Sequence, residues 1–230
     1  MKIGIIAEGH SDIRVIERIL KGCAGIDSSD VKPLLPEDQL DETSLAEIDE
    51  KQFSSWTCVR RECQTQNRIS EFIDSPVEDE RFVIIQMDSA ERGEYGVPEP
   101  TRSHIADWKE YSRQVRENII AKISEWTENK FGNRLLYAIC VEELDAWLIP
   151  LYDSDILETA QKANAKEYLW RQCISVLKPK EKNAIVSCIR LSDSYYKLSE
   201  GLKKPKVLKQ CACHNESLRL FCDSLAFLRN

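Results

Sequence analysis

Three runs of apolar residues, each followed at once by acidic side chains, constrain the fold of this chain more than any other feature. Runs of this length without polar alternation are typical of strands buried on both faces, as in a parallel sheet covered by helices. Because ligands of such sheets bind beyond the carboxyl ends of the strands, we expect the acids to face a common crevice. The runs cover residues 3–7, 82–87 and 135–141, and the acids after them are Glu8, Asp88 and the pair Glu142 and Glu143.

Helical patterns separate these runs. Apolar residues recur at helical spacing from Ile13 to Leu20, with Ser11 placed as an N-cap, and again across 56–73 and 106–129. The short run 31–35 contains Pro33 and predicts an edge strand, since proline cannot donate to a ladder. The acidic, polar segment 36–55 predicts a surface loop. The fold class is therefore α/β, with a small, mainly parallel sheet flanked by helices.

The C-terminal third reads as helical. Helices are predicted over 143–151, 154–163, 165–177, 180–191 and 215–228, with Pro179 and Pro205 separating the pieces. We therefore expect an α/β core over residues 1–150 and a helical extension over 151–230 that packs on it.

Composition excludes several classes of protein. The chain has 230 residues, of which 42% are hydrophobic, enough for a packed core. Its net charge of −7 gives no argument for nucleic-acid binding by charge alone, although a local basic groove stays possible. No apolar run is long enough for a membrane span and no signal peptide is seen, so we expect a cytoplasmic protein without membrane contact, with its nine cysteines reduced.

The clustered acids predict a metal site. Carboxylates held together repel one another unless a cation neutralises them, and oxygen ligands of this kind suit Mg²⁺ or Mn²⁺. The candidate ligands are Glu8, Asp88, Glu91, Glu142 and Asp145, of which Glu8, Asp88 and Glu142 are also the candidate catalytic residues. For Glu142 and Glu143 an alternative is that they only complement the N-terminus of the following helix.

The strand, Glu8-Gly9 turn and helix, followed by a strand that ends in Asp88, resemble a Toprim domain over roughly residues 1–150. The family pattern is Glu after the first strand and Asp-x-Asp after a later one. Here the second Asp is replaced by Ala90, a departure for which Glu91 could compensate. The segment from Val141 to Pro150 further resembles small stand-alone Toprim-like proteins of bacteria and their viruses. The resemblance implies a Toprim- or Rossmann-like sheet.

The resemblance also implies a function. It suggests a metal-dependent nuclease acting on DNA or RNA phosphodiesters, similar to OLD-family nucleases, as an anti-phage effector beside an ATPase partner. No Gly-rich Walker loop is present, so ATP binding would belong to that partner. The alternative is a binding or regulatory module on the same fold, with weakened metal chemistry, that docks on a partner protein. Ala90 favours this alternative.

Basic side chains concentrate in the C-terminal third. Lys197, Lys203 and Lys204 are candidate nucleic-acid contacts, and the resemblance implies that a lysine such as Lys197 or Lys204 assists the metal. Solvated helix ends explain the same lysines equally well. The adjacent Tyr195 and Tyr196 are candidates for stacking a base or for partial burial in the core.

Three further motifs have plainer explanations. His10 suits a general acid or base but is more simply a loop side chain. Asp12 is close to Glu8, yet capping of the following helix explains it as well. The segment Cys211-Ala212-Cys213-His214 invites a zinc site, but it lacks a matching second pair of ligands.

Overall fold

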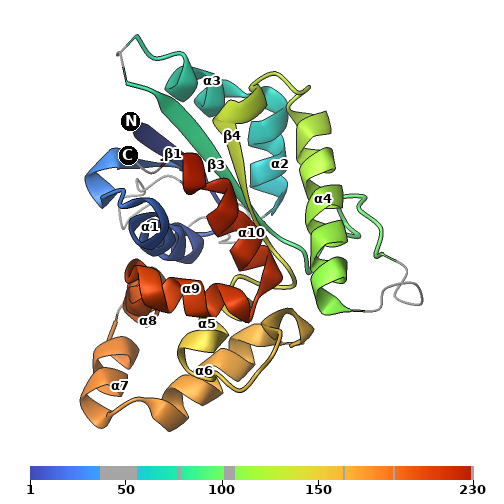
Figure 1. The fold of residues 1–230 in the computed structure, drawn as a ribbon. Coiled ribbons are helices and arrows are strands. Elements are labelled where there is room, and N and C mark those ends of the chain that lie inside the picture. Colours follow the sequence, from blue (N-terminus) through green and yellow to red (C-terminus); the bar gives the residue numbers. More distant parts are fainter. Residues whose placement is uncertain (37–55, 77–78, 101–106, 163, 189, 229–230) are drawn as a thin grey trace, which may run out of the picture.

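The computed structural model describes residues 1–36, 56–76, 79–100, 107–162, 164–188 and 190–228 (Figure 1). Within these ranges four strands make a single sheet: β1 (Lys2–Ile6), β2 (Val31–Leu35), β3 (Arg81–Asp88) and β4 (Leu135–Cys140). All pairings are parallel, and the strand order is β2-β1-β3-β4. The predicted α/β class with a small parallel sheet is confirmed, and the loop predicted over 36–55 lies almost wholly outside the described residues.

Helices cover both faces of the sheet. One face packs against α1 (His10–Ala24), through residues such as Ile3, Ile5 and Ile84. The other face packs against α2 (Trp56–Thr65), α3 (Asn67–Ile73) and α4 (Trp108–Trp126), through residues such as Val83 and Ile85. Burial on both faces explains why the strands read as unbroken apolar runs.

The strand order creates a switch point between β1 and β3. The chain leaves β1 toward β2 on one side and leaves β3 toward β4 on the other, so the two connections, α1 and α4, lie on opposite faces. Such a divergence opens a crevice beyond the carboxyl ends of the two central strands, which is where ligands of open α/β sheets bind. Glu8 and Asp88 stand at this point.

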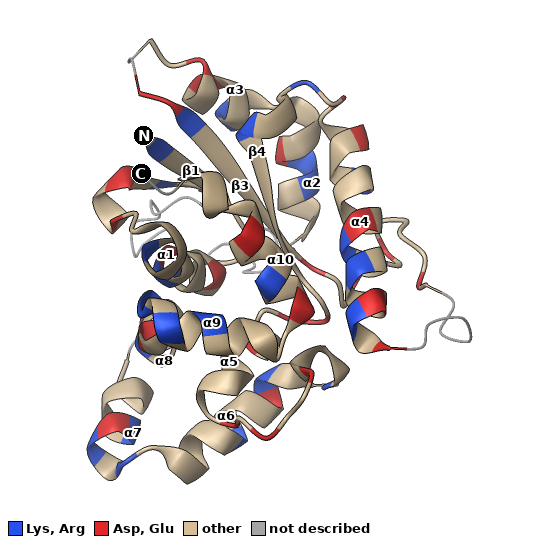
Figure 2. Ribbon diagram, in the orientation of Figure 1, with Lys and Arg blue, Asp and Glu red and all other residues tan. Residues whose placement is uncertain are grey.

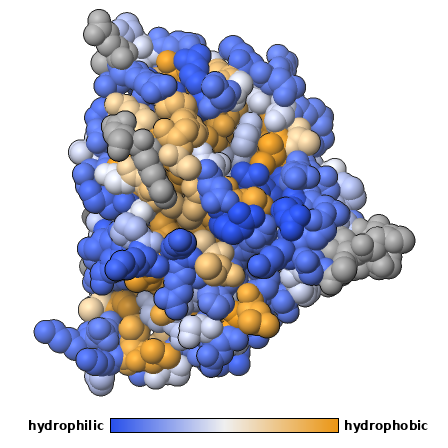
Figure 3. All heavy atoms as spheres, in the orientation of Figure 1, coloured by the Kyte–Doolittle hydropathy of each residue, from blue (hydrophilic) through white to orange (hydrophobic). Residues whose placement is uncertain are grey.

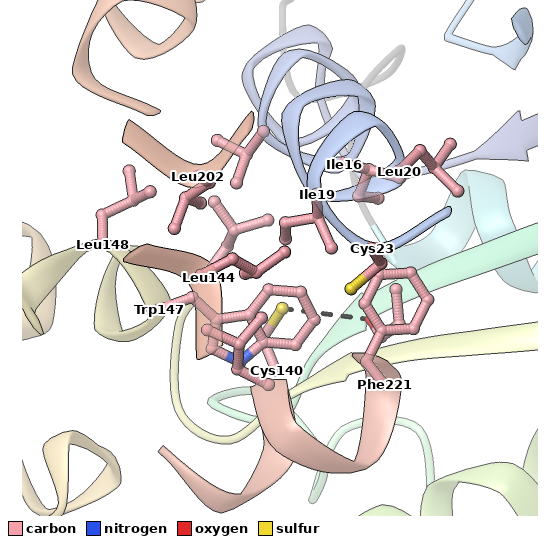
Figure 4. Packing of buried hydrophobic residues seen from close by; sticks show 14 of the residues in the cluster. Ile16, Ile19, Leu20, Cys23, Cys140, Leu144, Trp147, Leu148, Leu202 and Phe221 are labelled. Carbon is pink, nitrogen blue, oxygen red and sulfur yellow. Dashed lines mark hydrogen bonds between the residues drawn. The ribbon is translucent and has the colours of Figure 1, made fainter. Parts of the chain in front are cut away.

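The C-terminal helices share the core of the sheet. They are α5 (Asp145–Leu148), α6 (Ala165–Val176), α7 (Pro179–Val186), α8 (Leu191–Leu198), α9 (Pro205–Cys213) and α10 (Glu216–Ser224). One continuous buried cluster joins α1 and β4 to α5, the 3₁₀ turn η7 (Ser199–Lys203) and α10. Figure 4 shows Cys23 of α1 and Cys140 of β4 beside Trp147 and Phe221. The rings of Trp147 and Phe221 are stacked, with their centroids 5.6 Å apart.

Several element boundaries differ from the expectation. The single helix expected over 56–73 is two helices, divided at Gln66, which has a left-handed φ of 57°. The buried Glu62 carboxylate accepts the backbone N–H groups of Arg68 and Ile69 and so fixes the start of α3. Helix α1 begins at His10 with Gly9, not Ser11, at the N-cap.

The C-terminal helices also differ in their limits. The helix expected over 154–163 is wrong in extent, because the described part of that range, 154–162, forms only a 3₁₀ turn, η6 (Thr159–Gln161). Helices α8 and α9 were not expected. Pro179 and Pro205 are the first residues of α7 and α9, a position that tolerates the missing proline N–H.

The surface carries a group of exposed apolar side chains on α6 to α8. Ile174, Val176, Val186 and Leu191 are each more than half exposed. Figure 3 shows apolar surface at the lower edge of the molecule, where α6 and α7 lie. Within the described ranges, no helix has the length and apolar character needed to cross a membrane.

Candidate functional site

Four carboxylates from separate elements gather at the switch point. Glu8 follows β1, Asp12 lies in the first turn of α1, Asp88 ends β3 and Asp145 begins α5 just after β4. Figure 2 shows acidic residues at the end of the sheet that faces α5 and α6. We call Glu8, Asp12, Asp88 and Asp145 the acidic site.

A closed ring of hydrogen bonds ties the two central strand ends together. The Glu8 backbone N–H donates to Gln86 Oε1 at 2.9 Å, and Gln86 Nε2 donates to Asp88 Oδ1 at 2.8 Å. The Asp88 backbone N–H donates in turn to Glu8 Oε1 at 2.7 Å. The parallel pairing of β1 with β3 makes this ring possible, because it brings the two chain segments to the same level.

The second half of the site joins α1 to the C-terminal helices. Tyr195 of α8 donates its hydroxyl hydrogen to Asp145 Oδ1 at 2.5 Å, and Asp145 is only 8% exposed. The Asp12 carboxylate lies above Gly9, whose backbone forms a hydrogen bond with it. The Lys166 ammonium of α6 lies near enough to both Asp12 and Asp145 to lower the pKa of each.

Burial and mutual repulsion make the site unfavourable for negative charge. Burial raises the pKa of Glu8 to about 8, with a smaller contribution from the Asp12 and Glu91 charges. Burial and the Asp145 charge raise the pKa of Asp12 to about 7. The pKa of Asp88 is raised well above its ordinary value by burial and then by Glu8, Asp12 and Asp145. Burial also raises the pKa of Asp145 to about 6, although the Tyr195 hydroxyl opposes this.

The predicted ligands divide into two groups. Glu8, Asp88 and Asp145 belong to the acidic site, and the exposed Glu91 lies within electrostatic range of Glu8. Glu142 instead faces the guanidinium of Arg92, at 3.8 Å. It has a left-handed φ of 64°, and its backbone N–H donates to Ser89 Oγ at 2.7 Å, so this turn holds the ends of β3 and β4 together.

Ala90, the residue that departs from the Toprim pattern, lies in the turn after β3. Ala90 is exposed, and its backbone N–H donates to the Glu142 carbonyl at 3.0 Å. Glu143 uses its carboxylate to accept the Lys166 backbone N–H at the start of α6. Glu143 therefore supports a helix start, as the alternative reading allowed, but the helix is α6 rather than the one that follows it directly.

Two of the three predicted nucleic-acid contacts, Lys197 and Lys203, have local partners. Lys197 Nζ donates to the Ala184 carbonyl at 2.6 Å, and Lys203 forms an ion pair with Glu200. Lys204 is exposed and stands at the N-cap of α9. Neither of these two contacts includes a carboxylate of the acidic site, and the part of the three lysines in nucleic-acid binding stays a prediction.

The two adjacent tyrosines have different surroundings. Tyr195 is buried against Asp145, whereas Tyr196 is 38% exposed, and the Arg18 guanidinium carbon lies 3.5 Å from the centroid of its ring.

In the cysteine motif, Cys211 is buried, Cys213 is exposed and the His214 ring faces the Ile156 carbonyl. That arrangement favours packing over the zinc reading.

Sequence reasoning missed Gln86 and Lys166 and left Asp12 undecided. Gln86 is a fully buried polar residue inside an apolar run, which is a signal that could have been used. Asp12 follows Glu8 by four residues across a strand-to-helix turn, so both reach the same edge. Lys166 carried no signal, because only the fold brings α6 to the site.

The donor set suits a hard divalent cation. All four acids offer oxygen ligands, and their raised pKa values reflect a charge that a cation would neutralise. Over the described residues, no three Asp, Glu, His or Cys side chains are already drawn together as a metal centre. The carboxylates lie within electrostatic range of one another.

Comparisons with protein-family models, with curated proteins and with solved structures found no match to this chain.

Proposed function

We propose that the chain is a Mg²⁺- or Mn²⁺-dependent phosphodiesterase of Toprim type that acts on nucleic acid. The observation that carries the proposal is the acidic site itself. Four carboxylates from separate elements lie within electrostatic range of one another beyond the switch point of a parallel sheet, and each has a raised pKa. Burying several carboxylates close together is unfavourable in free energy unless a cation neutralises them. Such a cluster is therefore expected where a cation binds.

In this proposal Glu8, Asp88, Asp12 and Asp145 hold the metal, with Glu91 and Glu142 near the same edge. A divalent cation bound there would activate water and offset the charge that develops on the phosphate during hydrolysis. Lys166, close to Asp12 and Asp145, supplies a positive charge that attracts the phosphate backbone. Gly9, at the N-cap of α1, adds no side chain beside Asp12, where a Cβ would lie 3.3 Å from Asp12 Oδ2.

The biological setting in this proposal is anti-phage defence in the cytoplasm, with an ATPase as partner. This part rests on the resemblance to small Toprim-like proteins alone. DNA and RNA both fit the chemistry, because the phosphodiester is common to them.

A second candidate is a Toprim-fold module that docks on a partner protein. Two observations favour it. Ala90 stands where the family has a metal-binding Asp, and the exposed apolar side chains of α6 to α8 offer a contact surface. The two candidates share a fold and differ in whether the acidic site binds metal and cleaves.

The test is a cleavage assay on supercoiled DNA, single-stranded DNA and RNA, with Mg²⁺, with Mn²⁺ and with EDTA. We expect metal-dependent cleavage that Glu8→Gln and Asp88→Asn each abolish, while circular dichroism shows an unchanged fold. Glu94→Gln, which changes an exposed acid on the loop after β3, is the matched control and should cleave like wild type. Cleavage in EDTA, or cleavage that survives both site variants, would refute the enzyme proposal.

A further inference from the structure

Two buried, uncharged side chains bind the carboxylates of the acidic site. Gln86 is fully buried in β3, and its amide orientation is determined by its neighbours. The Glu8 backbone N–H needs an acceptor, so the amide oxygen faces Glu8 and the NH₂ group must face Asp88. The same NH₂ group contacts Cys140 Sγ at 3.9 Å. The Gln86 side chain therefore has one orientation available, and it holds Asp88 Oδ1 in place.

Tyr195 plays the corresponding part for Asp145. Its ring is 3% exposed and packs edge-on against Trp170, with the ring planes at 81°. The helix that carries it is fixed by neighbouring hydroxyls. Ser194 Oγ donates to the Ile185 carbonyl at 3.0 Å, and Ser199 Oγ donates to the Tyr195 carbonyl at 2.7 Å. The phenol therefore meets Asp145 from a rigid position.

The chemistry of these donors differs from that of an ion pair. A Lys or Arg donor would orient a carboxylate and also neutralise it. An amide or a phenol orients it and leaves its negative charge in place, so the attraction for an external cation is preserved. Hydrogen-bond partners of metal-binding carboxylates commonly set their orientation, and their loss weakens metal binding.

We propose that Gln86 and Tyr195 are positioning residues, which fix one oxygen of Asp88 and of Asp145 and so set the arrangement in which the acidic site binds a divalent cation. The proposal rests on the proposed function, since it presupposes that the site takes up such an ion. It also gives the C-terminal helices a direct part in the site, because Tyr195 lies on α8.

Tyr195→Phe tests the second half of the proposal. The variant removes one hydroxyl and preserves the buried ring. Tyr152→Phe is its matched control, because the Tyr152 hydroxyl also makes a single hydrogen bond in the same region, to the Leu198 carbonyl at 2.7 Å. The dissociation constant of Mn²⁺ is measured by isothermal titration calorimetry on the full chain at one pH. We expect binding to weaken about tenfold in Tyr195→Phe and to stay at the wild-type value in Tyr152→Phe.

Gln86→Leu tests the first half. Because the buried residue also supports the fold, Thr127→Val serves as its control. Thr127 is equally buried, and its hydroxyl bonds only backbone carbonyls at the end of α4. We expect Gln86→Leu to weaken Mn²⁺ binding about tenfold or more, and Thr127→Val to leave it unchanged even where it lowers the melting temperature.

The outcomes separate the two proposals. If wild type takes up no Mn²⁺, the proposed metal site is wrong and the positioning role falls with it. If wild type binds Mn²⁺ and Tyr195→Phe and Gln86→Leu bind it as tightly as their controls, the metal site stands and the positioning role alone is refuted. Weakened binding in both site variants, with both controls unchanged, supports the proposal.

Discussion

Replacing Asp12 by Asn should stabilise the metal-free protein at alkaline pH. The native carboxyl has its pKa raised from 3.8 to about 7, chiefly by burial and then by the Asp145 charge. Well below pH 3.8 the acid is protonated whether the chain is folded or unfolded, so it adds no pH dependence there. Between pH 4 and 7 the folded protein keeps a proton that the unfolded chain has lost, so the free energy of unfolding falls as pH rises.

The pKa shift sets an upper limit on this loss. It spans roughly three pH units, and each unit corresponds to about 1.36 kcal/mol, so the ionised Asp12 costs at most about 4 kcal/mol above pH 7. Glu8, Asp88 and Asp145 titrate with Asp12 and share the repulsion, so we expect about 2 kcal/mol for Asp12 alone. Asn keeps a side-chain oxygen that can accept the Gly9 bond, and it carries no charge.

The assay is urea unfolding followed by circular dichroism at pH 4, 6 and 8, in EDTA. Asp12→Asn and wild type should differ in stability by less than about 0.6 kcal/mol at pH 4, and the variant should be about 2 kcal/mol more stable at pH 8. Asp155→Asn, a change at an exposed acid, should match wild type at every pH. Saturating Mn²⁺ should then reverse the order, because it stabilises the protein that binds it. A gap that does not grow with pH in EDTA would refute the argument.

Three further predictions concern single side chains. Ala90→Asp adds an acid two residues beyond Asp88 and should tighten Mn²⁺ binding on the order of tenfold, measured by calorimetry against Ala90→Asn. Gly22→Ala should cost about 3 kcal/mol in urea unfolding, because the new Cβ would meet the Leu202 carbonyl oxygen, whereas Gly93→Ala, which has open space, should not destabilise. Trp147→Phe should cost about 2 kcal/mol in the same assay, since it leaves a void beside Phe221 and removes the bond from the indole to Ser217 Oγ.

The parts of the fold that depend on local pattern were predictable. Glu8 and Asp88 stand out because the apolar runs before them are buried on both faces, and a parallel sheet brings such strand ends together. The edge position of β2 was predictable from Pro33, because proline has no N–H to donate to a neighbouring strand. These inferences need only the pattern of apolar residues along the chain and the chemistry of single residues such as proline.

What depends on distant contacts was not predictable. Asp12 in the first turn of a helix has the same sequence appearance whether it caps the helix or faces a ligand, and here its carboxylate is close to both Gly9 and Asp145. Tyr195 and Tyr196 are adjacent in sequence, so only the packing of α8 decides that the first meets Asp145 and the second meets Arg18. Pro205 was read as a break between elements, yet at the first position of a helix it is a start.

The burial of α1 under the last helices has a consequence for the order in which the protein matures. The apolar face of α1 is synthesised before its cover, because η7, α8 and α9 come from residues 191–213. A nascent chain synthesised as far as residue 150 would hold the four described strands and still present an uncovered helix face, a state in which chaperones bind and aggregation begins. Tyr195 arrives with that cover. The step that covers α1 during translation therefore also delivers the Tyr195 hydroxyl that binds Asp145.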